Sequence, residues 1–514
     1  MGTWVATTIA AGALLEGCGS RPRTPRTPST STSAAPRPPT ASDWTALGSA
    51  LAGHLVLPTS PSYPTDRLLY NAKFTDLHPR AIAYCANTTD VARCVEFATS
   101  HAVAVAARSG GHSYGGYSTS GGLVIDVSPL AAVTVDPRAN IATVGAGAQL
   151  IDVYNAVGRA ERLLPGGSCP SVGIAGLVLG GGIGVFGRQY GLTADNLRAV
   201  NLITADGTLV TANESDHADL WWASRGGGGG NYGVATSFEF AVHPMPPVTL
   251  FTRQYPWEAA ATVLAAWQQW IGSAPDQLWS NCLLLSQGSY GYLAQISGVL
   301  CGSPGELASL LAPLNADIAS APSYTFDGAE EYLTAMEIEA GCSGLSIASC
   351  HLSNERPQGH LSRSASSAKS SYVDEPMSSA RVNLMIEAVT HLQQHAPTVG
   401  GGLAFDAYGG AINRVASHDS AFVHRDKLAG IQASYSWSSE APASVVAAGQ
   451  EWLTWLGENV FDANTGAYQN YIDSTLADWQ RAYYGTNLPR LVAIKRRYDP
   501  DNLFSFAQSI PLSL

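Results

Sequence analysis

The stretch Arg108-Ser-Gly-Gly-His-Ser-Tyr-Gly-Gly116 constrains the fold most, because it surrounds a single histidine, His112, with four glycines. Glycine weakens helices and strands but adopts the backbone conformations that tight loops need. Successive N–H groups of such a loop can turn inward and form a concave nest for a phosphate or pyrophosphate. His112 then adds a nucleophilic imidazole beside the bound group. The alternative for this stretch alone is an ordinary surface turn.

A second glycine-dense stretch, between Leu164 and Leu197, favours the binding loop over the surface turn. It reads LPGGSCPSVGIAGLVLGGGIGVFGRQYGLTADNL and carries one cysteine, Cys169, near its start. The chain thus holds two glycine-rich loops, one with a histidine and one with a cysteine.

Together the two stretches resemble the FAD-binding domain of the vanillyl-alcohol-oxidase superfamily, in the berberine-bridge-enzyme-like branch that includes glucooligosaccharide and hexose oxidases. In that branch R-S-G-G-H-S carries a histidine bonded to the flavin 8α-methyl group, and G-x-C-x-x-V-G carries a cysteine bonded to flavin C6. Both motifs are present, at residues 108–113 and 167–173. The resemblance implies bicovalent FAD, attached through His112 and Cys169.

The resemblance also implies an α+β fold, in which a two-part PCMH-type FAD-binding domain is joined to a substrate domain with an antiparallel sheet backed by helices. A length of 514 residues exceeds what one hydrophobic core usually organises. We assign the FAD-binding domain to residues 64–245 and the substrate-binding domain to 246–460. Residues 461–514 resemble the family's C-terminal segment, which returns to the FAD domain.

Local patterns predict the elements around these motifs. We expect a strand over 81–85, a helix capped by Thr89 or Asp90 that runs to about His101, and a strand over 103–108. The His112 loop would then follow the C-terminal end of a strand, where ligands bind α/β sheets. Asp206-Gly207 predicts a hairpin turn. Antiparallel strands are expected over 281–286, 292–301, 405–410 and 433–439.

Further cofactor contacts are carried over from the family. The segment 225–234 is similar to an R-G-G-G-x-N-x-G-V motif that lies against the flavin. Gly145 is either another close approach of backbone to cofactor or part of a plain strand-to-helix turn. No metal ligand is assigned, and the implied contacts are Arg108, Ser109, Gly110, Gly111, Ser113, Gly145, Val172, Gly173, Gly176, Gly181, Gly182, Asn231, Gly233, Val234, Tyr468 and Asn470.

The expected chemistry is alcohol oxidation, in which a hydride moves to flavin N5 while a base takes the hydroxyl proton. The family supplies the base from the second tyrosine of Y-x-N-Y, here Tyr471. A phenol with a pKa of about 10 needs a proton acceptor or a field that favours phenolate, and Asp406 resembles the carboxylate that partners this tyrosine in sugar oxidases. The alternatives are a core tyrosine and a structural aspartate. A small residue at Val172 accompanies oxidases, which implies O2 as acceptor and H2O2 as product.

The expected partners are O2 and a sugar or oligosaccharide. A bulky secondary metabolite, as in antibiotic-tailoring or alkaloid-forming relatives, is the nearest alternative, and a flavin-retaining binding protein without catalysis is another. The net charge of −12 disfavours a nucleic-acid partner, and we interpret Lys495-Arg-Arg497 as a solvated helix face. The sequence predicts no oligomeric state.

The N-terminus predicts export. Thr3–Leu15 is an apolar run of signal-peptide length, and Leu15-Glu-Gly-Cys18 resembles a bacterial lipobox, which would anchor the protein to the membrane through a lipid at Cys18. No Lys or Arg precedes the run, so the alternatives are a start further upstream or no export. We assign residues 1–19 to a signal or lipoprotein-like peptide and 20–42 to a Pro/Ser/Thr-rich tether. The protein is expected to be secreted or held outside the cell membrane of a bacterium.

The chain has eight cysteines, which suits an oxidising compartment. Proximity in the sequence favours disulfides between Cys85 and Cys94, between Cys282 and Cys301, and between Cys342 and Cys350. The alternative is free buried thiols.

Overall fold

The computed structural model describes residues 37–438, 440–462 and 464–514. The predicted signal peptide, Cys18 and most of the predicted tether lie outside the described residues. The last two residues of the predicted tether belong instead to the first turn of helix α1 (Ala41–Ala50), because Thr40 caps that helix by accepting a hydrogen bond from the Asp43 N–H.

The first sheet carries the strand that delivers His112. Its order is β1-β2-β4-β3, and its strands are β1 (His54–Val56), β2 (Ala81–Tyr84), β4 (Leu123–Asp126) and β3 (Val105–Arg108). Strands β2 and β3 run parallel to β4, which is buried along its whole length. Such continuous burial is typical of parallel strands covered on both faces. The expected strand-helix-strand order is confirmed, since α3 (Thr88–His101) lies between β2 and β3 in the chain.

One detail of α3 differs from the prediction. The helix begins at Thr88, and its cap is Asn87, whose side-chain oxygen accepts a hydrogen bond of 2.9 Å from the Asp90 N–H. The Asp90 carboxylate is engaged elsewhere, by the N–H groups of Ala52 and Gly53. A buried carboxylate with these partners is not free to cap the helix.

The second sheet is antiparallel and holds the predicted hairpin. Its order is β5-β6-β10-β8-β9, with strands β5 (Val133–Asp136), β6 (Ile141–Gly145), β10 (Val234–Ala241), β8 (Leu197–Ile203) and β9 (Leu209–Asn213). The hairpin joins β8 to β9, and Gly207 in its turn has a φ of 78°. A short pair, β7 (Arg162–Leu163) and β11 (His243–Pro244), lies outside this sheet.

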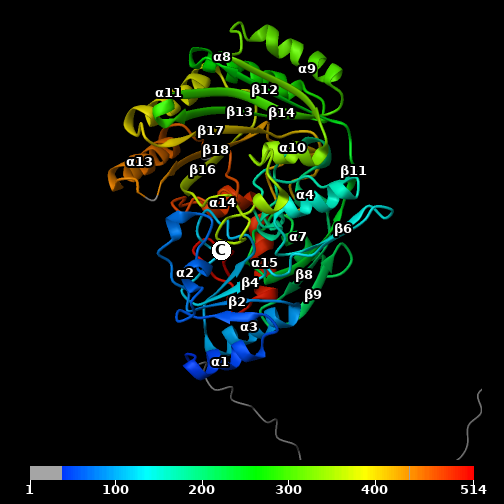
Figure 1. Ribbon diagram of the computed structural model, residues 1–514, viewed down its shortest axis with the longest axis vertical. Helices are drawn as coiled ribbons and strands as arrows, with labels where there is room; N and C mark the ends of the chain where they lie inside the picture. The colour runs from blue at the N-terminus through cyan, green and yellow to red at the C-terminus, as the bar shows by residue number, and fades with distance from the viewer. Residues whose placement is uncertain (1–36, 439, 463) are drawn as a thin grey trace, which may run out of the picture. The chain divides into compact units, whose positions relative to one another are not determined.

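A larger antiparallel sheet of seven strands follows in the chain. Its order is β15-β12-β14-β13-β17-β18-β16, and its strands are β15 (Tyr324–Glu330), β12 (Val248–Tyr255), β14 (Tyr292–Cys301), β13 (Leu278–Gln287), β17 (Gly400–Ala407), β18 (Ala429–Trp437) and β16 (Ala365–Val373). Each expected antiparallel strand has a counterpart in this sheet, but the strand predicted over 405–410 ends at Ala407, because Gly409 and Gly410 turn the backbone away with φ values of 90° and 54°. Helices lie along one face of this sheet (Figure 1), and they are α8 (Ala260–Ser273), α9 (Pro304–Asp317), α11 (Ser379–His395) and α13 (Ala443–Asn459). The predicted α+β arrangement is therefore confirmed.

The remaining helices are short, apart from the C-terminal one. They are α2 (Tyr63–Asp66), α4 (Leu150–Arg159), α5 (Ile174–Leu179), α6 (Gly187–Tyr190), α7 (Ala218–Ala223), α10 (Tyr332–Glu339), α12 (Ala411–Arg414), α14 (Trp479–Tyr484) and α15 (Leu488–Tyr498), with 3-10 turns at η1 (Ala72–Phe74), η2 (Thr193–Asn196), η3 (Trp257–Ala259), η4 (Gly288–Tyr290), η5 (Ile347–Ser349) and η6 (Gly485–Asn487). Although α15 lies near the chain's end, it packs against α7 among the early strands (Figure 1). No helix in the described part of the chain is both long and apolar enough to cross a bilayer.

The predicted disulfides are not formed, because every described cysteine is a free thiol. The Sγ atoms of Cys85 and Cys94 lie 4.0 Å apart, about twice the length of an S–S bond. Cys282 stands opposite Ile296, five residues before Cys301 along β14. At ~3.3 Å per residue this separates the two cysteines by roughly 16 Å, so their predicted pairing is wrong. Cys342 and Cys350 share a small buried cluster as thiols.

Candidate active site

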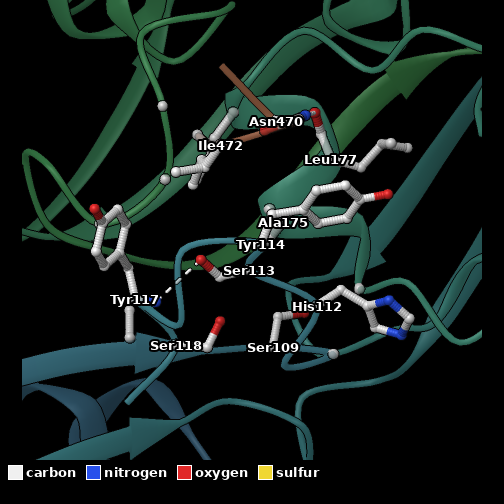
Figure 2. A pocket seen from close by; sticks show the side chains of 18 of the residues that line it. Ser109, His112, Ser113, Tyr114, Tyr117, Ser118, Ala175, Leu177, Asn470 and Ile472 are labelled. Carbon is white, nitrogen blue, oxygen red and sulfur yellow. Dashed lines mark hydrogen bonds between the residues drawn. The ribbon is translucent and has the colours of Figure 1, made fainter. Parts of the chain in front are cut away.

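A cavity of about 410 Å³ opens between the two glycine-rich stretches and the C-terminal segment. Strand β3 and the loop after it line the cavity with residues 105–114 and 117–120, and α5 and the loop before it contribute a second wall. Figure 2 shows His112, Ser113 and Tyr114 on one side, with Leu177 and Asn470 on the other. Three segments that are distant in the sequence thus enclose one space.

Glycine is required where the two stretches meet. A Cβ on Gly110 would lie 2.3 Å from the Gly173 backbone nitrogen, so the two loops pack backbone against backbone. A Cβ on Gly176 would meet nothing within 4 Å, because that position faces the cavity. A bound group can therefore approach the backbone closely at Gly176.

Several buried polar atoms at the cavity have no partner within the described residues. They are the Arg108 Nη1, the Tyr117 hydroxyl and the Thr119 hydroxyl. Arg108 is itself held in place by an ion pair with Asp126. Unpaired buried donors are costly, so the cavity fits a ligand that supplies hydrogen-bond acceptors, as the phosphates and ring carbonyls of FAD would.

His112 and Cys169, the predicted attachment residues, both line this cavity. Burial lowers the pKa of His112 to about 3, so its imidazole is neutral and nucleophilic. The ring stacks on Tyr70 at 3.9 Å between centroids, and its Nε2 lies 3.0 Å from the Ser171 Oγ. Burial raises the pKa of the Cys169 thiol, while hydrogen bonds from Ser171 oppose that rise. Ser171 therefore contacts both residues.

Most of the predicted cofactor contacts line the cavity. These are Arg108, Ser109, Gly110, Gly111, Ser113, Val172, Gly173, Gly176, Asn231, Gly233, Val234, Tyr468 and Asn470.

Gly145, Gly181 and Gly182 do not line it. A Cβ on Gly145 would lie 2.0 Å from the Leu130 carbonyl oxygen, which makes it a packing glycine of the turn after β6. Gly181 and Gly182 have φ values of 118° and 79°, and side chains of the surrounding core crowd both positions. Backbone geometry thus explains these three glycines.

A second cavity, of about 330 Å³, continues from the first and lies against the large sheet. Gly167, Ser168, Ile183 and Tyr471 line both cavities. The sheet contributes residues from five strands, β12 to β15 and β17, and Asp406 is among them. The structure therefore places Tyr471 between the two cavities and Asp406 in the second one.

The electrostatics of this junction are set by burial. Burial first, and then the charge of Asp406, raises the pKa of Tyr471 well above its usual value. Burial also raises the pKa of Asp406 to about 6. Near neutral pH the phenol is therefore protonated, whereas most of the carboxyl groups are ionised and able to accept a proton.

Several residues that line the two cavities were not predicted from the sequence. Tyr114 stacks near Tyr471 at 5.6 Å between ring centroids, and its hydroxyl accepts a 2.8 Å hydrogen bond from Gln432. Tyr114 follows His112 by two residues, so its place in the same loop was a usable signal. Gln432 and Glu339, which lines the second cavity, come from segments whose patterns carry no such signal.

The chain is similar to FAD-linked oxidoreductases both in sequence and in fold. The family described as FAD binding domain matches residues 79–213, and the family described as berberine and berberine like matches residues 467–511. The FAD-linked oxidoreductase YgaK of Bacillus subtilis is 32% identical to this chain, and the match covers 90% of this chain and 97% of YgaK. The xylooligosaccharide oxidase of Thermothelomyces thermophilus is 29% identical to this chain, and the match covers 88% of this chain and 90% of that oxidase. The structure of BBE-like 1 from Physcomitrella patens aligns with a TM-score of 0.82 and 31% identity, covering 92% of this chain and 99% of that one.

Proposed function

Because this chain belongs to the berberine-bridge-enzyme-like family of FAD-linked oxidoreductases, we propose that it oxidises a hydroxyl group of a sugar or oligosaccharide and reduces O2 to H2O2. The family establishes the PCMH-type α+β fold, the FAD cofactor and an oxidoreductase activity. The substrate class, the electron acceptor and the bicovalent attachment of FAD through His112 and Cys169 are the proposed part.

One observation carries the proposal, which is that Tyr471 lies where the cofactor cavity meets a second cavity with a polar sheet wall. Bound FAD supplies the hydride acceptor for the reaction. A substrate in the second cavity would place its hydroxyl group beside Tyr471, which takes the proton. Because Tyr471 is itself protonated at neutral pH, its own hydroxyl proton passes to Asp406 as it takes the proton of the substrate. Asp406 can accept that proton because its pKa of about 6 leaves most of its carboxyl groups ionised at neutral pH.

O2 as the acceptor is supported by Val172. Its side chain is small, half-buried and lines the cofactor cavity three residues after Cys169. A small side chain there leaves room for O2 to approach the cofactor. Oligosaccharide oxidases among the relatives of this chain agree with this choice.

Peroxide release tests the proposal directly. The holoenzyme would be mixed with a panel of mono- and oligosaccharides and, separately, with bulky phenolic and alkaloid compounds, and H2O2 would be followed with a peroxidase dye. We expect release with saccharides. H2O2 release only with the phenolic and alkaloid compounds would mean that the substrate is not a saccharide. Flavin reduction without H2O2 release would mean that O2 is not the electron acceptor.

Bicovalent attachment of FAD through His112 and Cys169 predicts the intact mass of the denatured protein and of its variants. The denatured wild-type protein should retain the mass of one FAD, and His112→Ala and Cys169→Ala should each retain it through the remaining bond. The double variant should lose covalent FAD completely. Intact-mass spectrometry of the four denatured proteins measures this, and a wild-type protein that releases all its flavin would rule out both attachments.

The proton acceptor predicts a pH dependence. Burial raises the pKa of Asp406 to about 6, so lowering the pH through 6 protonates the acceptor, and kcat/KM should fall about tenfold per unit below it. The profile of kcat/KM reports groups of the free enzyme. Asp406→Asn should remove this acidic limb and lower kcat/KM at neutral pH. Because the pKa of Glu339 is also raised, to about 7, the same profile is measured for Glu339→Gln, in which the limb near pH 6 should persist whatever the change in KM. A limb that disappears in that variant would contradict the assignment to Asp406.

A further inference from the structure

Glu339 is the last residue of α10, and its side chain lines the second cavity together with Asp406 and Tyr471. A carboxylate at this end of a helix faces the negative end of the helix dipole, so the helix gains nothing from it. Within the described residues, the Glu339 carboxyl has no hydrogen-bond or ion-pair partner. The Glu339 carboxyl therefore lies in the cavity without stabilising the fold.

The charge of the cavity lining is one-sided. Glu339 and Asp406 line it, whereas no Lys, Arg or His is among the lining residues. Burial and then the charge of Asp406 raise the pKa of Glu339 to about 7. A cation or a hydroxyl donor bound between the two acids would relieve this repulsion, and an added anion would increase it.

The sheet wall of the cavity offers a row of polar partners. Thr252, Ser297, Asn281 and Asp406 stand opposite one another on the neighbouring strands β12, β14, β13 and β17. At ~4.8 Å between strands the row is roughly 14 Å long. The Trp279 indole N–H also lines this cavity, and it is buried without a partner in the described structure. These groups suit a molecule with hydroxyl groups along its length.

We propose that Glu339 is a specificity-determining residue, whose carboxylate binds an ammonium or hydroxyl group of a saccharide at a position away from the reacting carbon. With Asp406 it makes the cavity accept neutral and amino-substituted saccharides and reject anionic ones. This inference rests on the proposed function, since it assumes a saccharide in the second cavity.

Trisaccharides of glucosamine, glucose and galacturonate test the proposal, because they carry positive, zero and negative charge, respectively. Their affinities would be measured at pH 7 by calorimetry on FAD-loaded Tyr471→Phe and Tyr471→Phe/Glu339→Gln, which avoids turnover. We expect the glucosamine trimer to bind at least tenfold more tightly than the galacturonate trimer, and Glu339→Gln to remove most of this ratio. In enzymes that keep Tyr471, peroxide assays should show that Glu339→Gln changes the preference among the trisaccharides mainly through KM, with kcat altered less than twofold.

Glu337→Gln is the matched control, because Glu337 lies on the same helix but lines neither cavity. It should leave all three affinities unchanged. If the glucosamine trimer fails to bind, or if Glu339→Gln leaves the ratio unaltered, the proposal is wrong. If the trimers bind as expected but none is oxidised, the specificity assignment stands and the proposed reaction fails.

Discussion

Replacing Tyr471 by phenylalanine should lower kcat by about 10²- to 10⁴-fold, the range that the loss of a general base produces. Tyr471 is the tyrosine that lines both the cofactor cavity and the second cavity, so its hydroxyl lies where the substrate proton must leave. Phenylalanine keeps the ring, which stacks with Tyr114 and packs edge-on against Tyr468. The variant should therefore retain bound FAD and substrate affinity while losing the chemical step. Anaerobic reduction of the flavin by substrate, followed by stopped-flow absorbance, measures that step alone.

Tyr408→Phe is the matched control for this experiment. Tyr408 is also a buried tyrosine, its hydroxyl donates a 3.3 Å hydrogen bond to the Tyr372 hydroxyl, and it lines neither cavity. Its loss should cost about 1 kcal/mol of stability and leave the reduction rate within twofold. A Tyr471→Phe enzyme that keeps its rate within tenfold would show that another group takes the proton.

The cofactor loops could be predicted from the sequence because their constraint is local. Glycines around a histidine or a cysteine favour a tight loop, and the structure brings the loops of His112 and Cys169 to one cavity. Gly145 shows the limit of this reasoning, because a glycine needed for packing against the Leu130 carbonyl has the same sequence pattern as one that faces a ligand. Only the direction of the missing Cβ distinguishes the two.

Apart from Asp406, which the family resemblance supplied, the substrate side could not be predicted from the sequence, because its residues meet through strand register. Thr252 and Asp406 are more than 150 positions apart in the chain, yet they belong to one row across the sheet. Glu339 lies in a stretch without apolar periodicity, and nothing local distinguishes it from Glu337. The long-range pairing that brings such residues together is a property of the folded sheet.

Long-range packing also decides the role of the triplet Lys495-Arg-Arg497, which was predicted to be a solvated helix face. Arg497 fits that prediction, with 62% of its side chain exposed, whereas Lys495 is fully buried. The Lys495 Nζ donates to the Asp499 carboxylate at 2.6 Å and to the carbonyl oxygens of Asn231 and Phe504 at 2.8 and 2.6 Å. One lysine of α15 thus joins the C-terminal segment to the loop that carries Asn231.

Lys495→Met should therefore lower the free energy of unfolding by about 3–5 kcal/mol, because it leaves the buried Asp499 carboxylate without its counter-ion. Urea denaturation of the holoenzyme, followed by tryptophan fluorescence, measures this loss. Arg497→Met on the same helix is the control, and its exposed ion pair with Asp219 should contribute less than about 1 kcal/mol. Lys495→Met/Asp499→Leu should recover only part of the loss, because Asp499 also accepts hydrogen bonds from the N–H groups of Leu503 and Phe504. Equal effects of Lys495→Met and Arg497→Met would mean that the buried pair does not hold the C-terminal segment in place.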